Sequence, residues 1–98
     1  MAALYELCRD GKLDEVRAAL ACGGDVNDKD SYGRTALMMA VWTRHNSIVK
    51  LLLEQPALKV NEKDSGGQTA LHYAMWKNNA EGARMLLLHP GFHFNRQQ

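Results

Sequence analysis

The chain has 98 residues, of which 46% are hydrophobic, and its 12 Lys and Arg against 11 Asp and Glu leave a formal net charge of +1. The hydrophobic share argues against a disordered chain, and the balanced charge argues against a partner such as nucleic acid or an anionic membrane. A chain of this length suffices for one domain with a modest core.

The first segment predicts two short helices, over residues 2–10 and 13–22, that are separated by Gly11. No turn-rich stretch precedes them. This segment is more polar than the segment that follows it, because it carries six charged residues: Glu6, Arg9, Asp10, Asp14, Glu15 and Arg17. We therefore expect an end unit with one face in water.

The middle segment predicts a hairpin followed by two helices. Gly33 can supply the positive φ of the hairpin, and Asp30 can accept backbone hydrogen bonds in it. Thr35 suits a helix N-cap before the apolar run that follows. The spacing of apolar residues predicts helices over 36–43 and 47–54, and Pro56 ends the second of them.

The last segment repeats this pattern. Asp64 and Gly67 predict a second hairpin, and Thr69 suits a second N-cap. Helices are expected over 70–77 and 81–88, and Pro90 follows the second helix.

The similarity of the segments is an internal repeat of 34 residues. "GRTALMMAVW" at 33–42 matches "GQTALHYAMW" at 67–76, and the match extends to the leucine pairs, the prolines and an Asn61–Asn95 pair. The first segment aligns at an offset of 33. We predict one domain over residues 1–98, with units of about 1–29, 30–63 and 64–98.

The pattern G-x-T-A-L-H-x-A, followed by "IVKLLL" and a loop that ends in Val-Asn, resembles the ankyrin repeat. The resemblance covers residues 4–95. It implies an all-α repeat fold, a solenoid of stacked helix pairs with hairpin loops. It also implies non-catalytic binding of a partner protein on a concave face.

Several residues depart from the family pattern. Met38 stands where the next unit has His72, for which the resemblance implies a hydrogen bond to nearby hairpin backbone. Arg44 and Asn78 replace the usual glycine between the helices, and Gly82 replaces an apolar residue. We interpret these departures as local packing variants.

The repeat does not explain its two tryptophans, Trp42 and Trp76. Each lies two residues, or about 200° of helix, beyond a core alanine and is expected to point away from the core. Since packed helices lie about 8–10 Å apart, we expect the indoles to hold a partner's side chain between them. Alternatively, each indole lies across the neighbouring hairpin and satisfies its N–H there.

A larger set of residues is predicted to bind the partner: Tyr32, Arg34, Trp42, Thr43, Gln68, Trp76 and Lys77. Basic residues predominate on this face, so we expect a partner segment that is both acidic and apolar.

The asparagines that end each loop form a further series: Asn27, Asn61 and Asn95. Resemblance to the family allows them to be substrates of an asparaginyl hydroxylase. No nucleophile has a base at recognisable spacing, and His89 and His93 lack a third metal ligand. We therefore expect no enzyme activity, no cofactor and no metal.

The C-terminal end lacks a polar closing unit, so we expect Met75, Ala83 and Met85 to face solvent there. Either a longer array continues, which we favour, or this end forms a homodimer with a second copy. Two cysteines without a disulfide framework, no signal peptide and no long apolar run together predict an intracellular protein, cytoplasmic or nuclear.

Overall fold

Six short helices make up the secondary structure of residues 3–92, the part of the chain that the computed structural model describes. They are α1 (Leu4–Arg9), α2 (Leu13–Ala21), α3 (Ala36–Trp42), α4 (Asn46–Leu53), α5 (Ala70–Trp76) and α6 (Ala80–Leu88). Each predicted helix is present. Most of the predicted helices extend one residue too far at their C-terminal end. The extra residue, for example Thr43 or Lys77, is the C-cap, whose backbone no longer has helical geometry.

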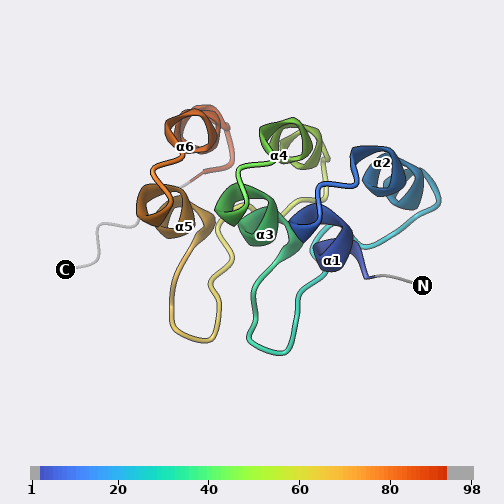
Figure 1. Ribbon diagram of the computed structural model, residues 1–98, viewed down its shortest axis with the longest axis horizontal. Helices are drawn as coiled ribbons and strands as arrows, with labels where there is room; N and C mark the ends of the chain where they lie inside the picture. The colour runs from blue at the N-terminus through green and yellow to red at the C-terminus, as the bar shows by residue number, and fades with distance from the viewer. Residues whose placement is uncertain (1–2, 93–98) are drawn as a thin grey trace.

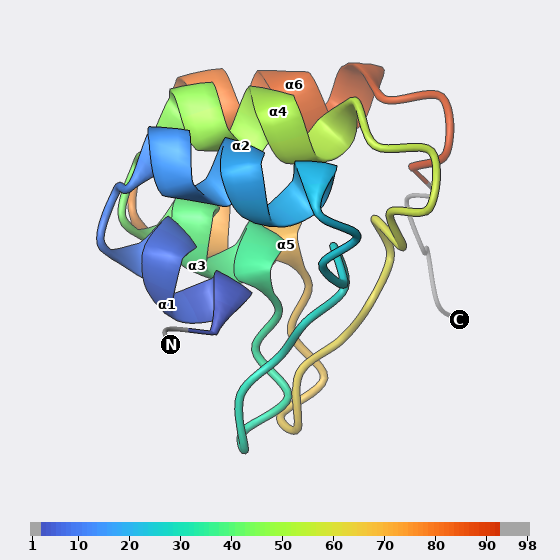
Figure 2. The same ribbon diagram turned by 90° about the vertical axis from the view of Figure 1, so that its right-hand side faces the viewer.

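The helices form two stacked layers (Figures 1 and 2). The inner layer contains α1, α3 and α5, and the outer layer contains α2, α4 and α6. The hairpins that precede α3 and α5 project beyond the inner layer (Figure 2). This arrangement confirms the predicted all-α solenoid of stacked helix pairs.

The turn between the two helices of each unit needs a left-handed residue. Gly11 has φ 74°, and the equivalent residues Arg44 and Asn78 have φ 62° and 54°. Left-handed backbone brings Cβ close to the following carbonyl, a cost that only glycine avoids fully and that asparagine tolerates better than arginine. The family's glycine at this position is therefore explained, and Arg44 occupies it at a steric cost.

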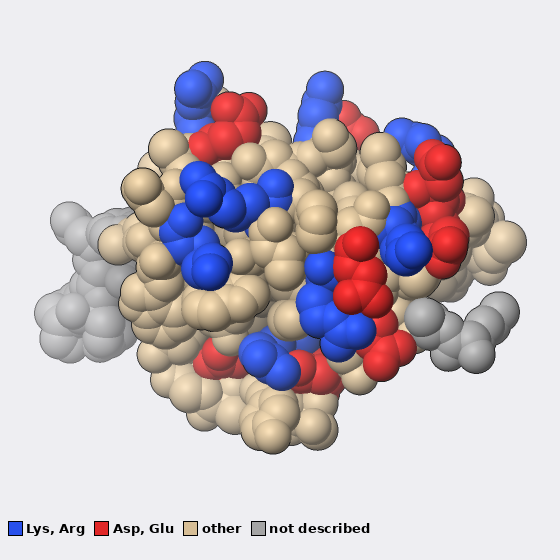
Figure 3. All heavy atoms as spheres, viewed as in Figure 1, with Lys and Arg blue, Asp and Glu red and all other residues tan. Residues whose placement is uncertain are grey.

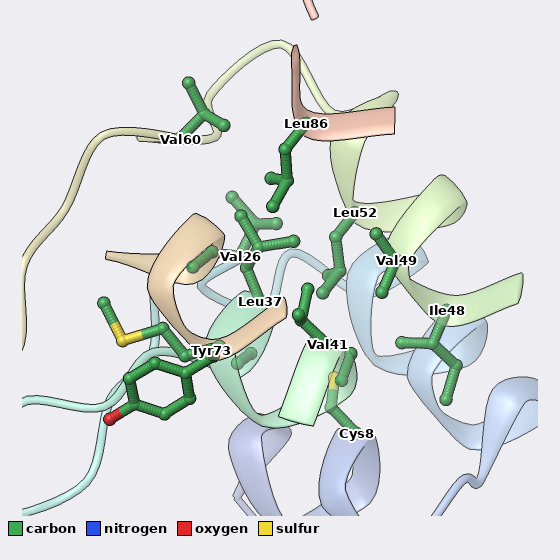
Figure 4. Close-up of a cluster of buried hydrophobic side chains, with 14 of the residues drawn as sticks. Cys8, Val26, Leu37, Val41, Ile48, Val49, Leu52, Val60, Tyr73 and Leu86 are labelled. Carbon is green, nitrogen blue, oxygen red and sulfur yellow. The ribbon is translucent and has the colours of Figure 1, made fainter. Parts of the chain in front are cut away.

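The core lies between the two layers. Leu37, Val41 and Leu52 point toward one another from α3 and α4 (Figure 4), and all three are almost fully buried. Leu86 of α6 lies beside this group (Figure 4). Apolar residues of each unit thus meet those of its neighbours, as a repeat stack requires.

Hydrogen bonds from side chains also join successive units. Nδ1 of His45 lies 3.2 Å from the carbonyl oxygen of Cys8, and the Asn79 amide donates to the carbonyl of Val41 at 3.1 Å. His45 and Asn79 are equivalent residues, and so are Cys8 and Val41. Each unit is therefore fixed to the preceding one at the same carbonyl.

Asn79 also explains the glycine of α6. Its Oδ1 accepts the N–H of Gly82 at 3.0 Å, and its amide pairs reciprocally with the amide of Asn46 at 2.9 and 3.0 Å. A Cβ on Gly82 would lie 2.7 Å from Nδ2 of Asn79. Gly82 is therefore more than a local packing variant, because it makes room for a buried cap.

The core assignment can be tested at Leu52, which is fully buried. We expect Leu52→Ala to lower the free energy of unfolding by about 2–5 kcal/mol, since it removes buried volume. A urea titration followed by circular dichroism measures this. Leu88→Ala, on an exposed side chain of α6, is the control and should leave the midpoint nearly unchanged. An unchanged midpoint for Leu52→Ala would contradict the assignment.

Candidate partner-binding surface

Each hairpin is built around one aspartate. Oδ1 of Asp30 accepts the N–H groups of Tyr32 and Arg34, both at 2.9 Å. Oδ1 of Asp64 accepts those of Gly66 and Gln68 at the same distance. The predicted role of the two aspartates is confirmed. Both predicted glycines, 33 and 67, have positive φ.

The two hairpins contact each other along their backbones. The N–H of Ser65 donates to the carbonyl of Tyr32 at 2.9 Å. A Cβ on Gly33 would lie 3.0 Å from the same nitrogen of Ser65, so the close approach favours glycine there. The hairpin tips are therefore held side by side.

The tip of the first hairpin presents Tyr32, which is 65% exposed. The guanidinium of Arg34 lies 5.0 Å from the Tyr32 ring centre, and Nε of Arg34 lies 2.7 Å from Oδ2 of Asp30. Arg34 was expected as a basic contact for a partner. In the structure its charge is already paired with Asp30, so its contribution to a basic surface is smaller than expected.

Tyr73 of α5 connects the inner layer to the second hairpin. Its hydroxyl donates a short hydrogen bond to Oδ2 of Asp64. Burial and this bond raise the pKa of Tyr73. Burial alone would raise the pKa of Asp64, but the Tyr73 hydroxyl, the backbone N–H groups of Gln68 and Gly66, and the charge of Arg34 outweigh it and lower that pKa.

Four side chains of α3 and α5 form what we call the aromatic cluster: Trp42, His72, Tyr73 and Trp76. The Tyr73 ring centre lies 5.4 Å from that of Trp42 and 5.6 Å from that of Trp76. The two indoles are 6.4 Å apart and perpendicular. The expected slot for a partner's side chain between them was wrong, because both indoles pack on Tyr73 and meet edge to face.

The two tryptophans differ in exposure. Trp76 is 58% exposed, whereas Trp42 is 37% exposed and lies against residues of α5. Nζ of Lys77 lies 4.9 Å from the centre of the Trp42 ring, a cation–π contact. Trp76 therefore offers more free surface, and Trp42 is partly a packing residue.

A groove of about 560 Å³ lies between α1, α3 and the first hairpin. Its lining residues are Tyr5, Glu6, Arg9, Asp30, Ser31, Tyr32, Arg34, Met39, Trp42 and Thr43. Four predicted contact residues thus meet in one groove. Gln68, Trp76 and Lys77 are not among its lining residues.

The predicted polar contacts are less available than expected. The hydroxyl of Thr43 donates to the carbonyl of Met39 at 2.7 Å, and the Gln68 amide donates to the carbonyl of Gly66 at 3.3 Å. Tyr5 and Met39 were not predicted. The repeat aligns Met39 with Tyr73, which contacts the second hairpin. This alignment could have identified Met39 as a residue that faces the hairpins.

His72 has the structural role that was predicted for it. Its Nδ1 accepts the N–H of Thr69 at 3.0 Å. In the preceding unit, Sδ of Met38 lies 3.4 Å from the N–H of Thr35 in the same geometry. A thioether sulfur thus replaces the imidazole as the acceptor.

Asn27 and Asn61 connect successive loops. The Asn27 amide donates to the carbonyl of Ala57 at 2.9 Å, and its Oδ1 accepts the N–H of Lys59 at 2.7 Å. The Asn61 amide donates to the carbonyl of Gly91 at 2.9 Å. Asn95 lies outside the described residues, as does His93. The hydroxylation of this series stays a prediction.

Between residues 3 and 92, no group of three His, Cys, Asp or Glu side chains is placed to hold a metal ion. No helix in the same range is long and apolar enough to cross a membrane.

Comparison with known proteins supports the repeat. The family model for ankyrin repeats, in three copies, matches residues 4–98. The chain is 48% identical over 52 residues to a mitochondrial disaggregase of Homo sapiens and 44% identical over 52 residues to that of Bos taurus. It is 39% identical over 51 residues to a putative ankyrin repeat protein of Rickettsia bellii.

Each of these matches covers about half of the chain: 53% for the two disaggregases and 52% for the Rickettsia protein. The matched stretch is 7% of the human disaggregase, 8% of the bovine one and 53% of the Rickettsia protein. The chain therefore spans only a small part of the disaggregases it resembles.

The lowered pKa of Asp64 predicts a pH dependence. Unfolded Asp titrates near ~3.9, and the folded carboxylate binds its proton more weakly. Its stabilising effect is therefore complete above that pH and is lost as the pH falls through the folded value. The loss of stability caused by Asp64→Asn should shrink as the pH falls from 7 toward 2.

Urea midpoints of the wild type, Asp64→Asn and Tyr73→Phe at several pH values measure this. Tyr73→Phe removes one hydrogen bond to the carboxylate, so its deficit should also shrink in acid. A deficit that stays constant from pH 7 to pH 2 would show that the ionised carboxylate does not stabilise the hairpin.

Proposed function

The chain belongs to the ankyrin-repeat family, and we propose on that premise that it binds a partner protein through its inner helices and hairpins. Ankyrin repeats are generally protein–protein interaction modules and are generally non-catalytic. The stretch shared with the human disaggregase is 7% of that protein, so we propose binding alone and no disaggregase activity.

The observation that carries this proposal is the exposure of aromatic side chains beside the groove. Trp76 and Tyr32 are each more than half exposed, although burial of an aromatic side chain is favourable. Tryptophan and tyrosine are among the residues that contribute most to protein interfaces. We assign the main contacts to Trp76, Trp42 and Tyr32.

The other predicted contact residues surround these three: Arg34, Thr43, Gln68 and Lys77. The bonds that occupy Arg34, Thr43 and Gln68 within the chain support a secondary role for them. Lys77 is exposed and lies over the Trp42 ring, so it stands beside both indoles.

A pull-down from lysate tests the proposal, with Trp76→Ala as the sharpest variant because Trp76 is the more exposed indole. Truncating such an anchor typically costs at least ~2 kcal/mol, or roughly 30-fold in affinity. We expect a partner that the wild type retains to be lost by Trp76→Ala and by the double variant with Trp42→Ala. Leu88→Ala is the control for loss of exposed apolar surface away from the groove.

Circular dichroism must first show that each variant is folded, since Trp42 packs on Tyr73 and its truncation has a cost in stability. Recovery of the same proteins by wild type and Trp76→Ala would contradict the assignment of the contacts.

We propose a second interaction at the C-terminal end, where α5 and α6 have no following unit among the described residues. Val41 is fully buried, but its equivalent in the last unit, Met75, is 66% exposed. Leu53 is half-buried, whereas its equivalent Leu87 is exposed. Ala83 and Met85, which were expected to face solvent here, are half-buried. A second copy of the chain would cover this apolar face.

Light scattering across a range of concentrations tests this second proposal. We expect a mass of twice 11.0 kDa that Met75→Lys and Leu87→Glu reduce to that of one chain. Leu88→Glu is the matched control, because the equivalent Glu54 is already an exposed charge within the stack. A monomer at all concentrations would overturn the proposal.

A further inference from the structure

Of the residues in the turns between the two helices of each unit, Arg44 is the one that the repeat pattern explains least. It has a left-handed backbone, φ 62°, where the first unit has Gly11. A substitution by glycine would remove the steric cost of that conformation. Strained backbone positions often coincide with functional residues, so the side chain at this position needs an explanation.

The contacts of Arg44 within the chain do not supply that explanation. Nη2 of Arg44 donates to the carbonyl of Asn78 at 3.3 Å, a long bond on an exposed side chain. The ion pairs recorded within residues 3–92 involve Arg9, Arg17 and Arg34. The charge of Arg44 is not balanced by a carboxylate among them.

Lys77 lies one residue before Asn78, the equivalent of Arg44 in the last unit. It is the C-cap of α5, it is exposed, and its ammonium lies over the Trp42 ring. A cation at a helix C-terminus is favourable, which accounts for a positive charge there. The same effect favours Arg44 after the end of α3, but a cation at the C-cap, where Lys77 lies in α5, would provide it without a side chain in left-handed backbone.

Both cations lie near the C-terminal ends of the helices that carry the indoles. Arg44 is two residues after Trp42, the last residue of α3, and Lys77 is one residue after Trp76, the last residue of α5. Lys and Arg side chains gather over α3 and α5 in Figure 3, while Asp and Glu lie toward the margins of that region. The surface therefore combines two cations that are in none of the ion pairs of residues 3–92 with apolar aromatic area.

We propose that Arg44 and Lys77 bind the carboxylates of a peptide segment in which Asp or Glu lies next to an aromatic or aliphatic residue. That apolar residue contacts Trp76, and the acidic neighbour contacts the cations. This inference rests on the proposed function and adds to it the chemistry of the partner and Arg44 as a binding residue. Two cations and a net charge of +1 do not suit nucleic acid, whose binding proteins commonly neutralise roughly 6–10 phosphates.

A phage-displayed library of random 12-residue peptides tests the inference, selected on the wild type and counter-selected on Trp76→Ala. We expect selected peptides to be enriched in Asp or Glu beside an aromatic or aliphatic residue. Fluorescence anisotropy of a synthetic selected peptide then gives the affinity for each variant. The affinity should also fall as sodium chloride is raised, because charge pairs at an exposed surface are screened.

The decisive variants remove one cation each. Arg44→Gly should weaken binding at least ten-fold while leaving the thermal midpoint equal or higher, because it relieves the left-handed conformation. Lys77→Gln should weaken binding similarly, and Lys50→Gln, on an exposed residue of α4, is the control and should not. Lys77→Glu should restore binding of a peptide whose acidic residue is replaced by lysine.

The outcomes separate this inference from the function on which it rests. Peptides that need Trp76 but show no acidic enrichment, or that bind Arg44→Gly unchanged, overturn the inference and leave the proposed function standing. If no selected peptide requires Trp76 for binding, both the inference and the proposed function are contradicted. Competition by a 20-residue oligothymidine at 150 mM salt would also overturn the inference, in favour of nucleic acid.

Discussion

The structure depends on one constraint: a single pair of short helices cannot bury its own apolar face. Each pair is only six to nine residues per helix, so its stability comes from the neighbouring pairs. The same carbonyl, at Cys8 and again at Val41, receives a side chain from the next unit. Burial of apolar surface favours contact between the units but is not directional, whereas these hydrogen bonds fix the orientation of one unit relative to the next.

The proposed binding surface is a consequence of that stacking. The inner helices and hairpins lie on one side because every unit repeats the same path, and equivalent residues therefore form rows across the surface. Trp42 and Trp76 form one such row, and Lys77 lies over the Trp42 ring. Sequence changes at the more exposed positions, such as Trp76, alter the surface with little effect on the stack, which is why fold and partner can be specified almost independently.

The sequence was a good guide wherever a local rule decides the structure. Asp30 and Asp64 organise their turns through bonds that span two to four residues, and the left-handed turn explains Gly11 and the asparagine that replaces it in the last unit. The sequence was a poor guide to contacts between units. The contact of Trp42 with Tyr73 and the Asn46–Asn79 pair depend on distances that only the assembled stack sets.

The path from Tyr32 through Ser65, Asp64 and Tyr73 to Trp42 closes a ring of contacts between the last two units. The first and the last unit each have one neighbour among the described residues, and opening of the last unit would break this ring. If that unit opened, Trp76 would leave the surface and Trp42 would lose its support in the same event. The affinity for a partner is then the intrinsic affinity multiplied by the fraction of molecules in which this end is closed. Warming or a weakened terminal helix would loosen the partner well before the chain as a whole unfolds.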